Sequence, residues 1–492
     1  MRIGLYNRWL SILGGGERYM LELGLVLARL GHQVELLSQR LVDPALVRTR
    51  LGLEIGALGM RKLADEPGAA VVTEASAEYD LFIAVSHGDL FPSLARRSWM
   101  VVFFPEAEIA AGPEDKAAPY IWRGGYAEEL DGAGRRFRWL APEGAIWLPP
   151  GDAQEVTITC ERPNAGRVEW VFEDGAGKSI DLHPGKPVQM RLTLPRRQLA
   201  SGMLLSWRAA PLLVDDPRPL GLRLLGVALG RRRFLLSRPR ELLPSDRPEP
   251  ALALRSYSRL LAISDYTASW IIRRWGRRAE ILPPPVPQYQ PGAKHPLILS
   301  VGRFFRGLHA KRHDILIEAF RLLASSSAGW ELHLAGGLDE ANQDHQGYVE
   351  ELRRAASGLP VHFHINVAGD RLAELYSAAS FYWHAAGYGS DPEQVPEAQE
   401  HFGITTVEAM SAGCVPLVYA TGGPAEVVRD GIDGYHWREP EDLAGKTRAL
   451  IAGPELRERL GCAARERAAS YSPEAFAGRV DQLLREEMKD HQ

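Results

Sequence analysis

Two long stretches of this chain alternate short apolar segments with amphipathic segments of helical length, and no other feature constrains the fold as strongly. In the first stretch the predicted strands are residues 2–7, 33–38, 80–86 and 99–104. After a further predicted strand at 260–263, those of the second stretch are residues 297–301, 331–335, 361–365, 380–384 and 415–419. Strands that alternate with helices form parallel sheets covered on both faces. The sequence therefore predicts two α/β domains.

The stretch between them, from about residue 135 to residue 231, has a different pattern. Apolar and polar residues alternate, and turn signals such as Asp174-Gly175 and Pro184-Gly185 recur. This pattern is typical of an antiparallel β-sandwich of about seven or eight strands. We therefore expect such a sandwich inserted in the N-terminal half, with linkers at 107–134 and 232–252.

The composition limits the classes of protein to consider. The 492 residues include 58 lysines and arginines and 62 acidic residues, and the resulting net charge of −4 argues against a nucleic-acid-binding protein. No apolar run approaches the ~20 residues that span a bilayer, and the segment from Met1 to Tyr6 is expected to be a strand rather than a signal peptide. Three widely spaced cysteines form neither a disulfide framework nor a zinc pattern. We therefore expect a cytoplasmic protein.

Three glycine-rich segments stand directly before predicted helices: Gly14-Gly15-Gly16, the segment around Gly403, and Gly422-Gly423. The first N–H groups of a helix have no partner within it and can bind an anion such as phosphate. For each segment the alternative is an ordinary tight turn. The first segment departs from the dinucleotide-binding fingerprint, because Tyr19 takes the third glycine position and Gln39-Arg40 stand where an acidic ribose ligand is expected. An NAD-dependent enzyme is therefore not expected.

Charged residues near these segments are candidates for binding a diphosphate and a sugar. Arg303 follows the predicted strand 297–301, and Lys311 lies eight residues further on, so the pair can neutralise two phosphates. Glu400 and Glu408 flank the second glycine segment. The alternatives are solvated loop charges for the first three residues and, for Glu408, a capping box with Thr405 that needs no ligand.

Five motifs, taken in order, resemble glycosyltransferase family 4, a family of retaining sugar-nucleotide transferases with the two-domain GT-B fold. The motifs are Gly14-Gly15-Gly16-Glu17-Arg18; Ile263-Ser264-Asp265-Tyr266-Thr267 with Pro284-Pro285-Val286; Val301-Gly302-Arg303-Phe304 with Lys311-Arg312-His313-Asp314; Trp383-His384-Ala385-Ala386-Gly387-Tyr388-Gly389; and Glu400-His401-Phe402-Gly403-Ile404-Thr405 with Glu408. The resemblance covers about residues 1–106 and 255–480 and leaves out the predicted sandwich.

The resemblance implies an α/β protein of two facing Rossmann-like domains. The expected N-terminal, acceptor-side domain is 1–106, completed by 253–290 and a C-terminal helix at 470–488. The inserted sandwich is expected at 133–232, and the nucleotide-sugar-binding domain at 291–469.

The resemblance also implies roles for individual residues. Arg303 and Lys311 would stabilise the departing diphosphate, and Glu400 would bond the hydroxyls of the transferred sugar. His87 would lie beside the donor sugar, although a strand-end histidine bonded to the backbone is the alternative. The donor-binding residues would be Gly15, Gly16, Phe402, Gly403, Ile404, Thr405 and Glu408, the last on the ribose. Further candidates are His384 for the site and Glu106 for the acceptor.

The expected donor is a UDP- or GDP-sugar, and the acceptor is a glycan, a lipid-linked molecule or a small molecule. No cofactor or metal is expected, because no Asp-x-Asp pair stands in a suitable loop. Residues 270–278 are basic and aromatic, which fits either a peripheral contact with the inner face of the membrane or a core-packed helix. The sandwich has three interpretations: a glycan-binding module, a partner-binding module, or a dimerisation module. Two other functions stay open, a GT-B sugar-nucleotide epimerase and an inactive carbohydrate-binding scaffold.

Overall fold

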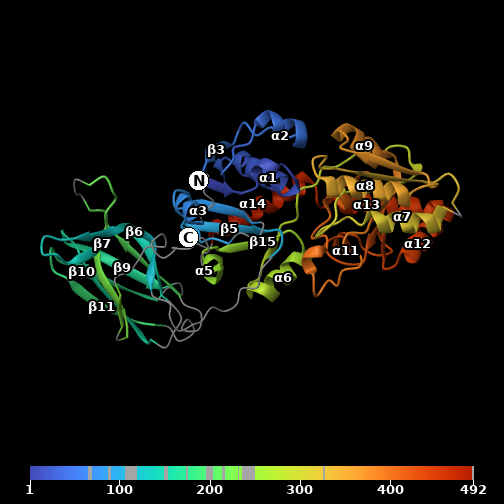
Figure 1. Cartoon of the computed structure of the whole chain (residues 1–492). Helices are drawn as coiled ribbons and strands as arrows, with labels where there is room; N and C mark the ends of the chain where they lie inside the picture. The colour runs from blue at the N-terminus through green and yellow to red at the C-terminus, as the bar shows by residue number, and fades with distance from the viewer. Residues whose placement is uncertain are drawn as a thin grey trace.

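The structure is a computed structural model, and Figure 1 shows its three parts, with the β-module at one end, the N-terminal α/β domain in the middle and the C-terminal α/β domain at the other end. The structure describes residues 1–64, 69–86, 90–105, 119–148, 153–172, 176–194, 203–212, 216–230, 232–234, 250–324 and 327–489.

Seven parallel strands form the sheet of the N-terminal domain. Their order is β16 (Glu280–Ile281), β15 (Arg259–Ala262), β5 (Arg97–Val102), β4 (Leu81–Ser86), β1 (Arg2–Tyr6), β2 (Gln33–Ser38) and β3 (Gly59–Lys62). One face is covered by α1 (Gly15–Arg29), α2 (Pro44–Leu51) and α14 (Pro473–Lys489). The other face is covered by α3 (Ala69–Ser76), α5 (Pro250–Arg255) and α6 (Asp265–Trp275). The domain thus combines segments from before and after the β-module.

Six parallel strands form the sheet of the C-terminal domain. Their order is β19 (Val361–Ile365), β18 (Glu331–Gly336), β17 (His295–Val301), β20 (Ala379–His384), β21 (Val415–Tyr419) and β22 (Tyr435–Trp437). The helices packed on one face are α7 (His313–Ala324), α8 (Gln343–Ala355), α12 (Pro440–Ala452) and α13 (Pro454–Ala469). Those on the other are α9 (Gly369–Ala378) and α10 (Ile404–Ser411). The prediction of two Rossmann-like domains is confirmed.

The strand order fixes where a ligand can bind. In each sheet the strands that follow the first one in the chain lie on one side of it, and the later strands lie on its other side. The change of side falls between β1 and β4 in the N-terminal sheet and between β17 and β20 in the C-terminal sheet. Open α/β sheets bind ligands at this switch point, beyond the carboxyl ends of the strands. In the C-terminal sheet, the loops 302–312 and 385–403 leave the carboxyl ends of β17 and β20.

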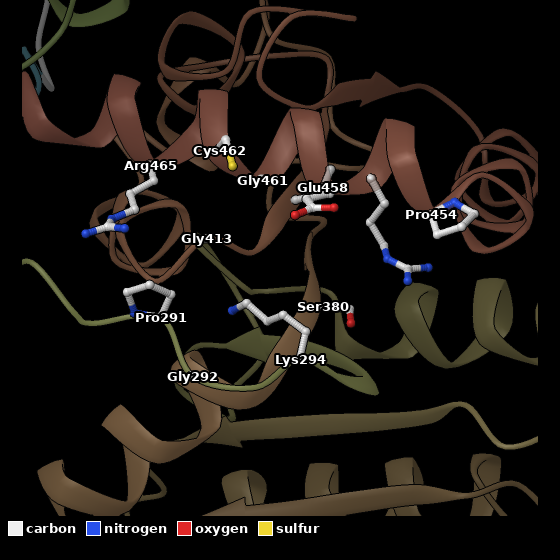
Figure 2. Close-up of a pocket in the computed structure, with 12 residues that line it drawn as sticks. Pro291, Gly292, Lys294, Ser380, Gly413, Pro454, Glu458, Gly461, Cys462 and Arg465 are labelled. Carbon is white, nitrogen blue, oxygen red and sulfur yellow. The ribbon is translucent and has the colours of Figure 1, made fainter.

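A pocket of about 360 Å³ lies at the opposite, amino ends of β17, β20 and β21. Lys294 lines it, and Figure 2 shows its side chain between the strands and α13. The Lys294 ammonium donates to the carbonyl oxygens of Ala412 (2.7 Å), Ser377 (3.0 Å) and Tyr376 (3.4 Å), at the carboxyl ends of α10 and α9. A cation at these helix ends is stabilising.

Replacing Lys294 by methionine is therefore expected to lower the free energy of unfolding by about 1–2 kcal/mol, because three carbonyl groups lose a charged donor. Urea unfolding followed by circular dichroism measures the change. Arg465 lines the same pocket with an exposed side chain, so Arg465→Met is the matched control and should leave the free energy of unfolding nearly unchanged. Equal stability of the two variants would contradict this role of Lys294.

The β-module is one antiparallel sheet of nine strands. The path is β10 (Gly177–Leu182), β9 (Gly166–Phe172), β12 (Met203–Ala209), β7 (Arg136–Leu148), β13 (Leu222–Leu229), β8 (Glu155–Glu161) and β11 (Val188–Thr193), with β6 (Tyr120–Leu130) beside β7 and β14 (Arg232–Phe234) beside β13. The end strands β10 and β11 contact each other, so the sheet curls into a nearly closed barrel.

The module differs in two ways from the expected sandwich. Its strands share one sheet instead of two, because the long strand β7 pairs with β13 through residues 138–140 and with β12 through residues 143–148. It also includes β6, which lies in the segment expected as a linker and pairs with β7. The tryptophans considered for sugar stacking are at most 7% exposed and belong to the core: Trp139, Trp147, Trp170 and Trp207.

The basic and aromatic side chains of helix α6 contact other parts of the protein. Trp270 and Trp275 are each 8% exposed and pack into the domain. Arg273 pairs with Glu393 at 2.8 Å, and Arg274 pairs with Glu397 at 2.5 Å. Both arginines therefore form ion pairs with residues of the C-terminal domain. The two tryptophans are therefore core-packed, and a contact of this helix with a membrane stays a prediction. None of the helices in the described ranges has the length and apolar character needed to cross a membrane.

Candidate functional site

The first turns of two helices, one from each domain, lie against each other. Helix α1 begins at Gly15 and α10 at Ile404. A Cβ atom on Gly15 would lie only 3.2 Å from Ile404 Cδ1, so the two helix starts approach each other closely. Both helices present their unpaired N–H groups and the positive ends of their dipoles at the same place. Such a place suits an anion with more than one phosphate.

The start of α10 tests the capping interpretation of Glu408. The N-cap is Gly403, and Thr405 is the second residue of the helix, so the capping box between Thr405 and Glu408 is not formed. Instead, Glu408 Oε2 accepts a hydrogen bond from the Tyr376 hydroxyl at 2.8 Å. Thr405 Oγ1 accepts one from the Tyr382 hydroxyl at 2.7 Å. The capping alternative is therefore wrong.

The carboxyl group of Glu408 titrates close to neutral pH. Burial raises the pKa of Glu408 to about 7, although the Tyr376 hydroxyl and the positive charge of Arg18 act in the opposite direction. Arg18 belongs to α1, so a cation of the N-terminal domain acts on a carboxyl group of the C-terminal domain. The Arg18 guanidinium also pairs with Glu22 at 3.6 Å. No role was predicted for Arg18 from the sequence, although it ends the first glycine-rich motif.

Lys311 and Glu400 form an ion pair, as expected for side chains of one site. His384, 4% exposed at the end of β20, places its Nε2 atom 3.7 Å from Glu400 Oε2. Burial alone would raise the pKa of Glu400, but Lys311 and His384 together hold it well below its usual value. The Lys311 stem packs directly on Gly302, where a Cβ atom would collide with it. The loop after β17 thus holds its lysine against the carboxylate that precedes α10.

Arg303 is exposed, and its guanidinium lies 4.9 Å from the centre of the Phe305 ring. No carboxylate among the described residues forms an ion pair with it. Burial lowers the pKa of His309, and the charges of Glu400, Lys311 and Arg303 also act on it. The two cations and the carboxylate predicted from the sequence therefore all act on one histidine.

His401 connects this site to the N-terminal domain. Its ring stacks on Phe104 at 4.2 Å between centroids, and the Ser264 hydroxyl donates to its carbonyl oxygen at 2.6 Å. Burial lowers the pKa of His401 to about 3, so the ring is neutral at physiological pH. No role was predicted for Phe104 from the sequence. It is the last residue of the strand predicted at 99–104, and parallel sheets place ligand-facing residues at the carboxyl ends of their strands.

The other predicted residues have three different outcomes. Phe402 is 4% exposed and packs against Tyr471 at 5.4 Å, so its side chain belongs to the core. Gly423 donates its N–H to the Glu400 carbonyl at 2.8 Å, so this third glycine segment supports the second one, and α11 (Pro424–Val427) behind it has only four residues. His87 and Glu106 lie outside the described residues.

A pair of Rossmann-like domains with a site at their boundary is the GT-B architecture. In this protein the helix starts and the cations lie at that boundary. Residues 287–467 match the family model described as Glycosyl transferases group 1. Among solved structures, Anabaena HepE in complex with UDP and glucose has a TM-score of 0.54 at 14% identity, covering 98% of this chain and 99% of that one, and this likeness concerns the fold.

Two curated relatives are similar to parts of the chain. The D-inositol 3-phosphate glycosyltransferase of Nocardiopsis dassonvillei is 28% identical over 292 residues, which is 53% of this chain and 64% of that protein. The GDP-Man:Man(3)GlcNAc(2)-PP-Dol alpha-1,2-mannosyltransferase of Xenopus laevis is 30% identical over 184 residues, 34% of each chain. The chain thus spans less than two thirds of the length of these relatives. Together the comparisons show that residues 287–467 are similar to the group 1 glycosyltransferases and that the chain shares its fold with HepE.

Proposed function

We propose that the chain transfers a sugar from a nucleotide-diphosphate sugar to a hydroxyl group of a glycan, a lipid-linked acceptor or a small molecule. One observation carries the proposal: the starts of α1 and α10 meet at the boundary of the domains, next to the loops that carry Lys311 and Glu400. Helix starts and fixed cations are what a diphosphate leaving group requires.

In this proposal each charged residue has one task. Arg303 and Lys311 bind the diphosphate, and their attraction grows as negative charge develops on it in the transition state. Glu400, kept ionised by Lys311 and His384, accepts hydrogen bonds from hydroxyls of the transferred sugar. Glu408 accepts hydrogen bonds from the ribose.

The transfer retains the configuration of the sugar. The acceptor oxygen attacks the anomeric carbon on the face from which the diphosphate departs, so the new C–O bond forms where the old one breaks. The acceptor's proton passes to an oxygen of the leaving phosphate. Proton NMR of the product measures the anomeric configuration, and an inverted anomer would contradict this course.

The reaction is proposed to need no metal ion, because Arg303, Lys311 and two helix starts supply positive charge where other transferases place a divalent cation. Treatment with EDTA should leave the rate unchanged. A loss of rate that Mg²⁺ or Mn²⁺ restores would contradict this part of the proposal.

The experiment that tests the function is nucleotide release from a panel of UDP-, GDP- and ADP-sugars, with and without glycan, lipid-linked and small-molecule acceptors. The proposal predicts acceptor-dependent release of one nucleotide diphosphate and a new glycoside. Binding of a donor without turnover on any acceptor would instead indicate a scaffold. Interconversion of the donor without transfer would indicate an epimerase, a function that the named relatives do not favour.

The role of Glu408 predicts a pH dependence. Its carboxyl group is protonated below about pH 7 and then accepts hydrogen bonds poorly. The donor KM should therefore fall roughly tenfold between about pH 6 and about pH 8, as the ionised fraction rises. In Glu408→Gln the donor KM should be high and independent of pH across this range.

Glu426→Gln is the matched control for this experiment, because burial also raises the pKa of Glu426 to about 7. This variant should keep the wild-type pH profile. If the pH dependence of the donor KM survives in Glu408→Gln and disappears in Glu426→Gln, it arises from Glu426, and the assigned role of Glu408 is contradicted.

A further inference from the structure

Four polar side chains gather at the edge of the C-terminal sheet, on two neighbouring parallel strands. Glu331 and His333 lie two residues apart on β18, and His362 and His364 lie two residues apart on β19. Side chains two residues apart point to the same face of a strand. The strands pair with His333 directly opposite His362, which brings the four together.

The distances within the cluster fit a metal ion. Glu331 Oε2 lies 3.1 Å from His333 Nε2 and 3.4 Å from His362 Nε2, and these three atoms all lie within 4.8 Å of one another. A tetrahedral zinc site with bonds of about 2.0–2.1 Å places its ligand atoms about 3.3 Å apart. The separations of 3.1 and 3.4 Å are therefore close to those of a tetrahedral site.

A second contact orients one of the ligands. His333 Nδ1 lies 3.0 Å from His364 Nε2, within hydrogen-bond distance. When Nδ1 donates this bond, the lone pair of His333 is on Nε2, the atom that faces Glu331. Histidines that bind metals characteristically donate from their other ring nitrogen in this way.

We propose that Glu331, His333 and His362 bind a divalent transition-metal cation, of which Zn²⁺ fits the two imidazoles and one carboxylate best. The side chains of Glu331 and His362 are each 49% exposed, so an ion can enter from solvent. His333 is 9% exposed and forms the inner wall of the site. The fourth coordination position stays open to water.

The site is structural rather than catalytic. Glu331 begins β18, whereas the loops that carry Arg303, Lys311 and Glu400 lie beyond the carboxyl ends of the strands. The bound ion would tie β19, the edge strand, to β18. Arg371 of α9 acts on His333 and His364 but donates a hydrogen bond to Glu374 at 2.6 Å, so part of its charge is offset.

The test is metal binding to the full-length chain, freed of any affinity tag and stripped of metal. Zn²⁺ competition with a chromophoric chelator should give one tight site per chain, and Co²⁺ should give the strong visible absorption of a tetrahedral complex. Saturating Zn²⁺ should raise the unfolding temperature by about 5 °C. His333→Ala and His362→Ala should lose all three signals.

His295→Ala is the matched control, since this exposed histidine lies on the same sheet outside the cluster and its loss should change nothing. Circular dichroism and the unfolding temperature in EDTA show whether each variant folds like the wild type. Absence of a tight site in the wild type, or a site that persists in His362→Ala, would overturn the proposal.

Discussion

Replacing Lys311 by alanine is expected to lower kcat for sugar transfer by about 10²–10³, the usual cost of losing one donor aimed at developing negative charge. The loss should appear mainly in kcat, because the attraction between the ammonium and the leaving diphosphate is strongest in the transition state. Steady-state kinetics of nucleotide release measures both kcat and KM.

Lys446→Ala is the control for Lys311→Ala. Lys446 forms an ion pair with Asp442 at 2.9 Å on α12, in the same domain and outside the site, so its removal should leave kcat unchanged. Lys311→Arg, which keeps the charge but not the point geometry, should recover only part of the rate. Wild-type turnover in Lys311→Ala would contradict the assigned site.

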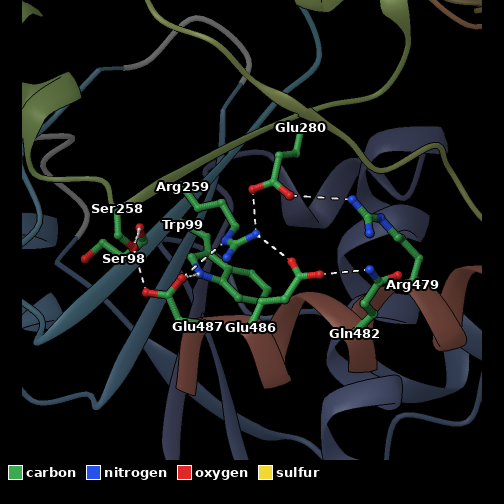
Figure 3. A network of polar contacts seen from close by, with 9 residues as sticks. All are labelled: Ser98, Trp99, Ser258, Arg259, Glu280, Arg479, Gln482, Glu486 and Glu487. Atoms are coloured by element: carbon green, nitrogen blue, oxygen red, sulfur yellow. Dashed lines mark hydrogen bonds and ion pairs between the residues drawn. The ribbon is translucent and has the colours of Figure 1, made fainter. Parts of the chain in front are cut away.

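The C-terminal helix α14 is fixed to the N-terminal domain by a charged network, which Figure 3 shows from close by. The side chain of Arg259 is 10% exposed and that of Glu487 is 5% exposed, and they pair at 3.2 Å. Arg259 also reaches Glu280 at 2.5 Å and Glu486 at 3.4 Å. Glu487 Oε2 accepts a further hydrogen bond from the Trp99 indole at 3.0 Å.

Replacing Arg259 by methionine is expected to lower the free energy of unfolding by about 3 kcal/mol, because it leaves the Glu487 carboxylate buried without its cation. Urea unfolding of the full chain, followed by tryptophan fluorescence, measures the change. The control is Arg485→Met on the same helix. The Arg485 side chain is 72% exposed, and its guanidinium pairs with Asp481 at 2.8 Å. That surface pair should contribute at most about 1 kcal/mol. Equal losses in the two variants would contradict the importance of burial here.

Much of the α/β fold could be predicted because buried parallel strands are short apolar runs. The strands predicted at 33–38, 361–365 and 415–419 agree with β2, β19 and β21 at both ends. A separate C-terminal helix was expected at 470–488, and the structure has a break between α13, which ends at Ala469, and α14, which begins at Pro473. This break lets α14 turn back onto the N-terminal domain, where Phe476 and Val480 join the core.

The topology of the β-module was harder to predict. Alternation of apolar and polar residues identifies strands but says nothing about their partners, which depend on contacts distant in the sequence. Strand β7 changes partner along its length, and this single feature joins the strands into one curled sheet. Nothing in the local pattern of residues 136–148 distinguishes that arrangement from two packed sheets.

Individual residues of the site were predicted from the sequence, but the contacts between the two domains were not. Spacing and resemblance pointed to Lys311 and Glu400, and the structure brings them into contact. Arg18 acts on Glu408, and His401 stacks on Phe104. The two residues of each pair lie far apart in the sequence. Such pairs follow from how the domains meet, which no local motif encodes.

The central claim is that helix starts and two cations bind a nucleotide diphosphate between the domains. Isothermal titration of UDP, GDP and the matching monophosphates into the wild type and into Arg303→Ala tests it most directly. The account predicts that one diphosphate binds at least about tenfold more tightly than its monophosphate, a difference of about 1.4 kcal/mol, and that Arg303→Ala removes this preference. Equal affinities for diphosphate and monophosphate in the wild type would contradict the account.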